Sequence, residues 1–183
     1  MSSYITRGGD DGFSGWLGEG RISKSTPRME ALGSIDEATA ALGVARGQCL
    51  AKEAGGIILR VQQDLYSLMA EVAAAPENAQ TFRMIGGEQV AWLEAQIETL
   101  AQTVPLPKGF IIPGDCLSAA ALDLARAIVR RSERRVVAVF ETGELTNADL
   151  IRYLNRLSSL IFLLELQEIQ ISGLEKPTLA KAP

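Results

Sequence analysis

Glycines and basic side chains gather near the start of the sequence in a pattern suited to holding an anion. Residues 6–24 read TRGGDDGFSGWLGEGRISK, with six glycines, two arginines and one lysine. Glycine lets backbone N–H groups approach an anion closely, and the basic side chains supply positive charge. The segment lacks the G-x-x-x-x-G-K-[ST] order of the P-loop and follows no strand pattern. Both a phosphate-binding loop and a flexible, solvated terminus remain open.

A second group of charges lies in the segment ARAIVRRSERR. Arg126, Arg130 and Glu133 are spaced i, i+4 and i+7, which places them on one face of a helix. We expect this face to lie opposite an apolar stripe that contains Leu124 and Ile128. The charged face is suited to binding an anion, but an ordinary solvated surface with an Arg130–Glu133 pair has the same pattern.

A stripe of small residues surrounds one carboxylate in the first helical segment. Gly33, Asp36, Ala40 and Gly43 lie at helical spacing, which lets another backbone approach closely. An aspartate enclosed in such a contact requires a cation, because burying an unpaired carboxylate is costly. The alternative is that the stripe faces water and Asp36 has no special role.

Two further residues stand out by their setting. Phe110 begins FIIPGD in a proline-rich connection, where an aromatic side chain usually anchors a loop to the core. Asn155 lies in a largely apolar helical segment, so its carboxamide must face a cavity or find a hydrogen-bond partner on another helix.

Composition limits the chemistry that these residues can perform. The 183-residue chain contains no histidine, which removes the usual general base, and its two cysteines lack the spacing of a metal site. A net charge of −4 gives no overall attraction to nucleic acid. No export-signal pattern and no long apolar stretch is found, so we expect a cytoplasmic protein without a membrane partner.

Five segments with helical periodicity must position these side chains. The first runs over about residues 28–50, the second ends at Pro76, the third stops before Pro105, the fourth begins near Pro113, and the fifth covers 146–171. Alternation typical of strands is missing, so the prediction is an all-α single domain over residues 1–172. The remaining residues 173–183 show no periodicity and are expected to be a flexible tail. The predicted apolar stripes are Leu32, Ile35, Thr39 and Leu42; Ile58, Val61, Leu65, Leu68 and Val72; Val90, Leu93, Ile97, Leu100 and Val104; and Leu117, Ala121, Leu124 and Ile128, continuing toward Val136 and Val139, with residues 160–164 apolar all round.

Taken together, these motifs resemble the PduO-type ATP:cob(I)alamin adenosyltransferases in the same order along nearly the whole chain. TRGGDDGFS is similar to that family's TRTGDxGxT loop, and GRISK to its basic segment ending in lysine. MEALGSIDEATAALG, FIIPGD, RRSERRVV and YLNRLSSLIF resemble the family's first-helix, FxLPGG, R-R-A-E-R-x-V and LNRLSDxLF motifs.

The resemblance implies a five-helix bundle that assembles as a homotrimer and has a nucleotide-binding loop over residues 4–24. It implies transfer of the adenosyl group of ATP, bound with Mg²⁺, to the cobalt of cob(I)alamin or a related corrinoid, with release of triphosphate. Asp36 and Arg126 would pair between subunits beside the corrinoid, Phe110 would displace the lower axial cobalt ligand, and Arg130 would assist catalysis. A reductase and an enzyme that uses adenosylcobalamin are the other implied partners. The residues implied to bind ATP are Thr6, Arg7, Gly8, Gly9, Ser14, Lys24, Arg130, Glu133, Arg134 and Asn155.

The missing histidine agrees with this chemistry, because a cob(I)alamin cobalt is itself a strong nucleophile and needs no protein base. The sequence departs from the family pattern at Gly8, Asp11, Asp115 and Ser159. Added negative charge at Asp11 and Asp115 is expected to weaken binding of the anionic nucleotide. The alternative function is therefore a non-catalytic relative that binds ATP or a corrinoid and acts in cofactor sensing or delivery.

Overall fold

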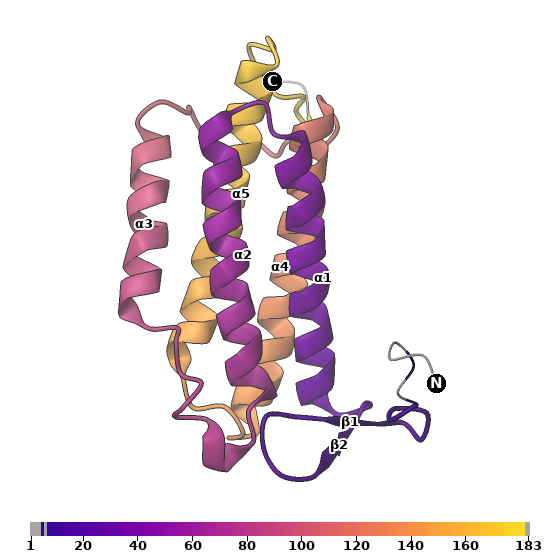
Figure 1. Ribbon diagram of the computed structural model, residues 1–183. Coiled ribbons are helices and arrows are strands. Elements are labelled where there is room, and N and C mark those ends of the chain that lie inside the picture. The colour runs from indigo at the N-terminus through magenta and orange to yellow at the C-terminus, as the bar shows by residue number, and fades with distance from the viewer. Residues whose placement is uncertain (1–4, 6, 182–183) are drawn as a thin grey trace.

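Five long helices make up most of the described part of the chain, as the periodicity predicts (Figure 1). The computed structural model describes residue 5 and residues 7–181. A short 3-10 helix, η1, follows α2. The helices are α1 (Pro27–Gln48), α2 (Lys52–Ala73), α3 (Gly87–Ala101), α4 (Leu117–Glu141) and α5 (Ala148–Ile171), and η1 is Pro76–Asn78.

A small antiparallel sheet corrects the expectation of a purely helical chain. Strands β1 (Phe13–Gly15) and β2 (Arg21–Ser23) pair within the N-terminal loop, with Ser14 opposite Ile22. Each strand has only three residues, which is too short to produce a period-two pattern in the sequence. The hairpin lies below the end of α1 in Figure 1, outside the helical bundle.

The helices pack in a defined order. Helix α1 packs against α2 and α4, α4 packs against α5, and α5 also packs against α3. Thr26 caps α1 by accepting a hydrogen bond from the amide of Met29, and Pro27 occupies the first turn. Asn147 caps α5 through the amide of Asp149, one residue later than the expected start at Thr146. These caps fix the ends of α1 and α5 that face the N-terminal loop.

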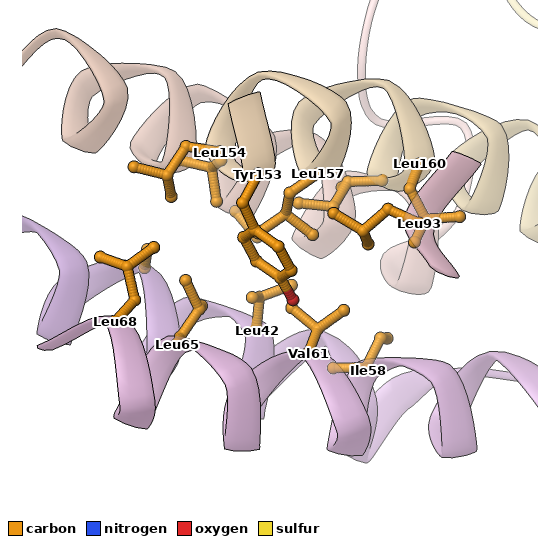
Figure 2. Close-up of a cluster of buried hydrophobic side chains, with 14 of the residues drawn as sticks. Leu42, Ile58, Val61, Leu65, Leu68, Leu93, Tyr153, Leu154, Leu157 and Leu160 are labelled. Carbon is orange, nitrogen blue, oxygen red and sulfur yellow. The ribbon is translucent and has the colours of Figure 1, made fainter. Parts of the chain in front are cut away.

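The core lies where most of the apolar stripes predict it. The full predicted stripe of α2 is buried, and α5 is buried on almost every side between Leu160 and Leu164. Figure 2 shows Tyr153 of α5 among leucines, with its hydroxyl directed toward α2. That hydroxyl donates a 3.1 Å hydrogen bond to Oδ2 of Asp64, so the polar atom is satisfied inside the core.

Helix α4 turns a different face to the core than the sequence predicts. Leu117 and Leu124 of the predicted stripe are 74% and 60% exposed. The buried stripe lies one position further along the chain and includes small residues that allow close packing. Its members are Ser118, Ala119, Leu122, Ala125, Val129, Ser132, Val136 and Val139. Leu117 and Leu124 are therefore wrong as core residues and form an apolar surface instead. Ala121 and Ile128 pack against the edge of the core, and Val136 and Val139, at the predicted continuation of the stripe, are buried as expected.

A buried arginine joins three segments at the end of the bundle that carries the N-terminal loop. Arg28 Nη1 donates to the carbonyls of Val72 (2.9 Å) and Ala74 (3.0 Å) at the end of α2. Its Nε donates to the carboxylate of Glu144 and its Nη2 to the Glu144 carbonyl, both at 2.9 Å. Leu17 in turn hydrogen-bonds Ala73 and Ala75, so the N-terminal loop rests on the segment that Arg28 holds.

The C-terminal segment, expected to be flexible, makes defined contacts. Ile111 and Leu179 form an antiparallel bridge, and Thr178 hydrogen-bonds the side chain of Asp115. Sequence periodicity could not indicate these contacts, because they join residues far apart in the chain. Within residues 5 and 7–181, no helix is long and apolar enough to cross a membrane.

Replacing Arg28 with methionine is predicted to lower the free energy of unfolding by about 3 kcal/mol or more. Buried carbonyls of α2 and the 142–147 segment would lose their donors, and methionine cannot replace them. Chemical denaturation followed by circular dichroism measures the loss. The control is Arg46→Met on the exposed side of the same helix, which should change stability by less than about 0.5 kcal/mol. Equal effects of the two substitutions would contradict the role of Arg28.

Candidate functional site

The N-terminal loop is closed by its own lysine. Lys24 Nζ donates to the carbonyl of Gly9 at 2.8 Å, and the Lys24 amide donates to the carbonyl of Gly12 at 2.9 Å. A Cβ atom on residue 9 would lie 2.6 Å from Lys24 Nζ, so any other residue there would require the lysine side chain to move. Arg7 adopts a φ of 56°, which turns the chain at the start of the loop.

The predicted anion-binding residues of the loop are thus brought together. Arg7, Gly8, Gly9 and Lys24 lie within one turn-rich segment, and Ser14 is half-buried on strand β1. The Ser14 hydroxyl donates to the carbonyl of Gly15 at 3.2 Å. Thr6, which the sequence also assigned to this group, lies outside the described residues.

Asp11 does not add an uncompensated negative charge to the loop. Its two carboxylate oxygens accept hydrogen bonds from Arg21 at 2.6 and 2.7 Å, and the amide of Phe13 donates a third at 3.2 Å. The Arg21 hydrogen bond, followed by that of the Phe13 amide, lowers the pKa of Asp11 to about 2. Arg21 also donates to the carbonyls of Gly8 and Phe13. The expected weakening of anion binding by Asp11 is therefore offset within the loop itself.

A second group of predicted residues meets across α4 and α5. Asn155 Nδ2 donates to Oε1 of Glu133 at 2.9 Å, so the carboxamide has a partner on the neighbouring helix. Arg134 Nη1 donates to the carbonyl of Arg130 at 2.9 Å. The guanidinium of Arg130 is exposed and makes no ion pair or hydrogen bond with any residue that the structure describes. Arg130 can therefore bind an incoming anion without breaking an internal contact.

Arg126 extends this surface toward the start of α4. Its Nη2 and Nε lie 2.7 and 3.0 Å from Oδ1 of Asp123, three residues earlier on the same helix. The guanidinium lies over the ring of Phe162 of α5, 5.6 Å from the ring centre. Arg126 is therefore held in place by two contacts, neither of which involves Asp36.

Asp36 lies on another face of the molecule. Its side chain is exposed on α1 and has no ion pair or hydrogen bond within the described part of the chain. Gly33 and Ala40 on either side are also exposed, whereas Gly43 lies against Gln62 of α2. In the single chain the stripe of small residues faces outward, and no described element covers Asp36.

Phe110 is not an anchor to the core, because its side chain is 90% exposed. It lies in the loop between α3 and α4, and its carbonyl accepts a 2.8 Å hydrogen bond from the amide of Ala180. An aromatic ring this exposed contributes little to folding, so the expected structural role does not account for it. The loop is at the end of the bundle opposite the N-terminal loop (Figure 1).

The predicted site residues thus form separate groups in one chain. The N-terminal loop is one group, the α4 and α5 surface is another, and Asp36 and Phe110 each lie apart from both. Among the described residues, no hydrogen bond or ion pair joins Asp36 to Arg126 or Lys24 to Arg130. In the single chain these residues therefore do not form one continuous site.

Sequence reasoning did not select Glu165, whose carboxylate is buried beside this surface. The residue is 1% exposed, and neither carboxylate oxygen has a hydrogen-bond partner among the described residues. Burial, helped by the negative charge of nearby Asp123 and opposed by Arg126, raises the pKa of Glu165 to about 7. The signal in the sequence is the acidic residue inside the apolar run IFLLEL.

Glu165→Gln is predicted to stabilise the protein at pH 8 and to have little effect near pH 4.5. The folded state holds the Glu165 proton more tightly than the unfolded state does, so stability falls as pH rises from about 4.5 to about 7. The gain at pH 8 is at most roughly 3 kcal/mol. Thermal unfolding of parent and variant across this pH range measures it, with the exposed Glu98→Gln as control. A gain that does not depend on pH would contradict the assignment.

Comparison with known proteins identifies the family to which these features belong. The family model described as cobalamin adenosyltransferase matches residues 4–168. The corrinoid adenosyltransferase PduO of Citrobacter freundii is 38% identical over 167 residues, which cover 90% of this chain and 49% of that protein. A second corrinoid adenosyltransferase of Citrobacter freundii is 37% identical over 164 residues, covering 88% of this chain and 92% of that protein. The chain thus spans about half the length of the PduO protein.

Solved structures agree with the sequence comparison. A variant PduO-type ATP:corrinoid adenosyltransferase from Lactobacillus reuteri, complexed with cobalamin and ATP, superposes with a TM-score of 0.90 at 27% identity. The alignment covers 98% of this chain and 100% of that one. The match extends over the five helices and the N-terminal loop that carry the candidate residues. The chain therefore belongs to the cobalamin adenosyltransferase family.

Proposed function

We propose that the chain transfers the 5′-deoxyadenosyl group of ATP to the cobalt of cob(I)alamin or a related reduced corrinoid. The observation that carries the proposal is that a member of this family presents two separate groups of anion-binding side chains, one in the N-terminal loop and one on the surface of α4 and α5. We call these two groups the half-sites. The Lactobacillus reuteri relative is named for this activity and was solved with cobalamin and ATP.

The active form that we propose is a homotrimer. The α1 surface with Asp36 and the α4 surface with Arg126 differ, so contacts between them are head-to-tail and close into a ring when the rotation allows. The exposed Leu117 and Leu124 on α4 support the proposal, because large apolar side chains on one helix face are typical of an interface. Asp36 of one subunit would then meet Arg126 of the next.

In this assembly the triphosphate would lie between the loop of one subunit and α4 and α5 of its neighbour. Backbone amides near Gly8 and Gly9, the amino group of Lys24 and the free guanidinium of Arg130 are suited to phosphate oxygens. Among the described residues, no three acidic, cysteine or histidine side chains gather as a metal site. We therefore propose that Mg²⁺ is held mainly by the phosphates, with water and at most one or two carboxylates.

The chemistry needs little from the protein beyond positioning and charge. The cobalt electron pair forms the Co–C5′ bond, and the C5′–O bond breaks with its electrons leaving on triphosphate. Arg130 and Lys24 would stabilise the added negative charge on that leaving group, which explains how a chain without histidine can catalyse the step. Phe110 would approach the lower face of the corrinoid and exclude the axial ligand and water.

An anaerobic spectrum tests the proposed activity directly. Protein, MgATP and chemically reduced cobalamin are mixed, and formation of adenosylcobalamin with release of triphosphate is followed. Binding of both ligands without turnover would instead support a non-catalytic carrier or sensor. In the proposed role, a reductase supplies the cob(I) state and an adenosylcobalamin-dependent enzyme receives the product.

Arg130→Ala is predicted to raise the KM for ATP by about tenfold or more, the loss expected for one charge-assisted contact. Steady-state kinetics with saturating cob(I)alamin measures the change. Arg131→Ala is the matched control, because this adjacent arginine pairs with Glu37 of α1 and belongs to no proposed half-site. Equal values of KM for the two variants would place the nucleotide elsewhere, provided that both retain the helical circular dichroism of the parent.

Asp36→Asn and Arg126→Met are each predicted to weaken the trimer and turnover, with much less than additive loss in the double variant. Arg126→Met would leave the Asp36 carboxylate uncompensated at a partly desolvated interface, which costs about 3 to 5 kcal/mol. Asp36→Asn would leave Arg126 paired with Asp123, so its loss should be smaller. Arg126 also contacts Asp123 and Phe162, so the coupling energy is the informative quantity rather than either single loss. Two double-mutant cycles measure the coupling, one from light scattering of the assembly and one from kcat/KM. A monomeric parent at micromolar concentration, or additivity within about 0.5 kcal/mol, would refute the pair.

A further inference from the structure

The C-terminal segment adds a short strand to the loop that carries Phe110. The amide of Ala180 donates to the carbonyl of Phe110, and the amide of Ile112 donates to the carbonyl of Thr178, both at 2.8 Å. Ile111 and Leu179 between them form an antiparallel bridge. We call residues 178–180 the clasp. In Figure 1 the C-terminal segment lies at the same end of the bundle as the loop between α3 and α4.

One carboxylate fastens the clasp to the loop. Asp115 Oδ2 accepts a 2.8 Å hydrogen bond from the amide of Thr178, and Oδ1 accepts one of 2.7 Å from the Thr178 hydroxyl. Both oxygens of the carboxylate are therefore used on a single residue of the clasp, and charge-assisted hydrogen bonds of this kind are stronger than neutral ones. Asp115 stands where the FxLPGG motif has glycine, which has no side chain to make this contact.

Phe110 depends on this backbone pairing for its position. Its side chain is 90% exposed, so packing against the core does not hold it. Its carbonyl is bound by the clasp, and Gly114, with a φ of 122°, turns the chain between the Phe110 segment and Asp115. The place of Phe110 on the surface is therefore set by the loop backbone, which the clasp and Asp115 stabilise together.

We propose that Asp115 and Thr178 are positioning residues for the reaction, which hold the Phe110 loop through the clasp. This inference rests on the proposed function, in which Phe110 faces the corrinoid. The clasp lies beyond residue 168, where the match to the family model ends, so its contribution does not follow from that match. The proposal also gives a role to Asp115, which departs from the family motif, because its carboxylate accepts two hydrogen bonds from Thr178.

The test compares Asp115→Ala and Thr178→Val with Phe110→Ala on two corrinoids. Cobalamin carries a nucleotide base that binds the lower face of cobalt, whereas cobinamide lacks that base. Removing Phe110, or releasing the loop that holds it, should lower kcat on cobalamin about tenfold more than on cobinamide. The KM for ATP should stay unchanged, because the nucleotide half-sites are elsewhere. Asp115→Asn, which keeps one acceptor oxygen, should give an intermediate loss.

Hydrogen exchange provides a readout that does not depend on activity. The amides of Ile112 and Ala180 should exchange faster in Asp115→Ala than in the parent, because their partners separate when the clasp opens. Glu175→Gln is the matched control, because Glu175 is exposed in the same segment and makes no side-chain hydrogen bond or ion pair with the residues that the structure describes. It should change neither exchange nor the ratio of the two corrinoid rates. In a Phe110→Ala background, Asp115→Ala should cause no further loss on cobalamin.

The outcomes separate this inference from the proposed function. If Phe110→Ala discriminates between the corrinoids and Asp115→Ala does not, the clasp has no positioning role although the proposed reaction stands. Unchanged exchange at Ile112 and Ala180 in Asp115→Ala would also overturn the inference. If the parent forms no adenosylcobalamin, the proposed function fails first and the positioning role fails with it.

Discussion

The close packing of α1 against α4 sets the rotation of α4, and the candidate site depends on that rotation. The hydroxyl of Ser132, fully buried, donates to the carbonyl of Ser34 at 2.6 Å, which requires the two helices to approach closely. Small buried residues, including Ala38 and Ala125, permit this approach. With α4 fixed in this way, Arg131 turns toward α1, while Glu133 reaches Asn155 on α5.

Much of the fold could be predicted from the sequence, because α2 has only one strongly apolar stripe and α5 is apolar on almost every side near its middle. Helix α4 has two candidate stripes, and periodicity cannot say which one faces the bundle. The leucine-rich stripe with Leu117 and Leu124 was the wrong choice, since the contact with α1 needs small side chains. The hairpin was missed for a different reason, because three-residue strands carry no usable pattern.

The sequence indicated which candidate residues lie near one another more readily than which contacts they make. The structure brings together the loop residues around Lys24 and the charged residues along α4, and their part in binding stays a prediction. Pairs that join distant segments had no signal in the sequence, and they change how single residues are interpreted. Asp11 and Asp115 look like added negative charge, yet each carboxylate is bound by a residue 10 or 63 positions away. The proposed pairing of Asp36 with Arg126 still awaits its test.

The division of the candidate residues between faces has a consequence for inheritance. In an assembly that joins the loop of one subunit to the α4 surface of the next, each site is composed of parts from two polypeptides. A chain damaged in the loop and a chain damaged on α4 can then form one intact site when they assemble together. Two alleles that are each inactive would therefore complement one another, whereas two alleles damaged on the same face would not.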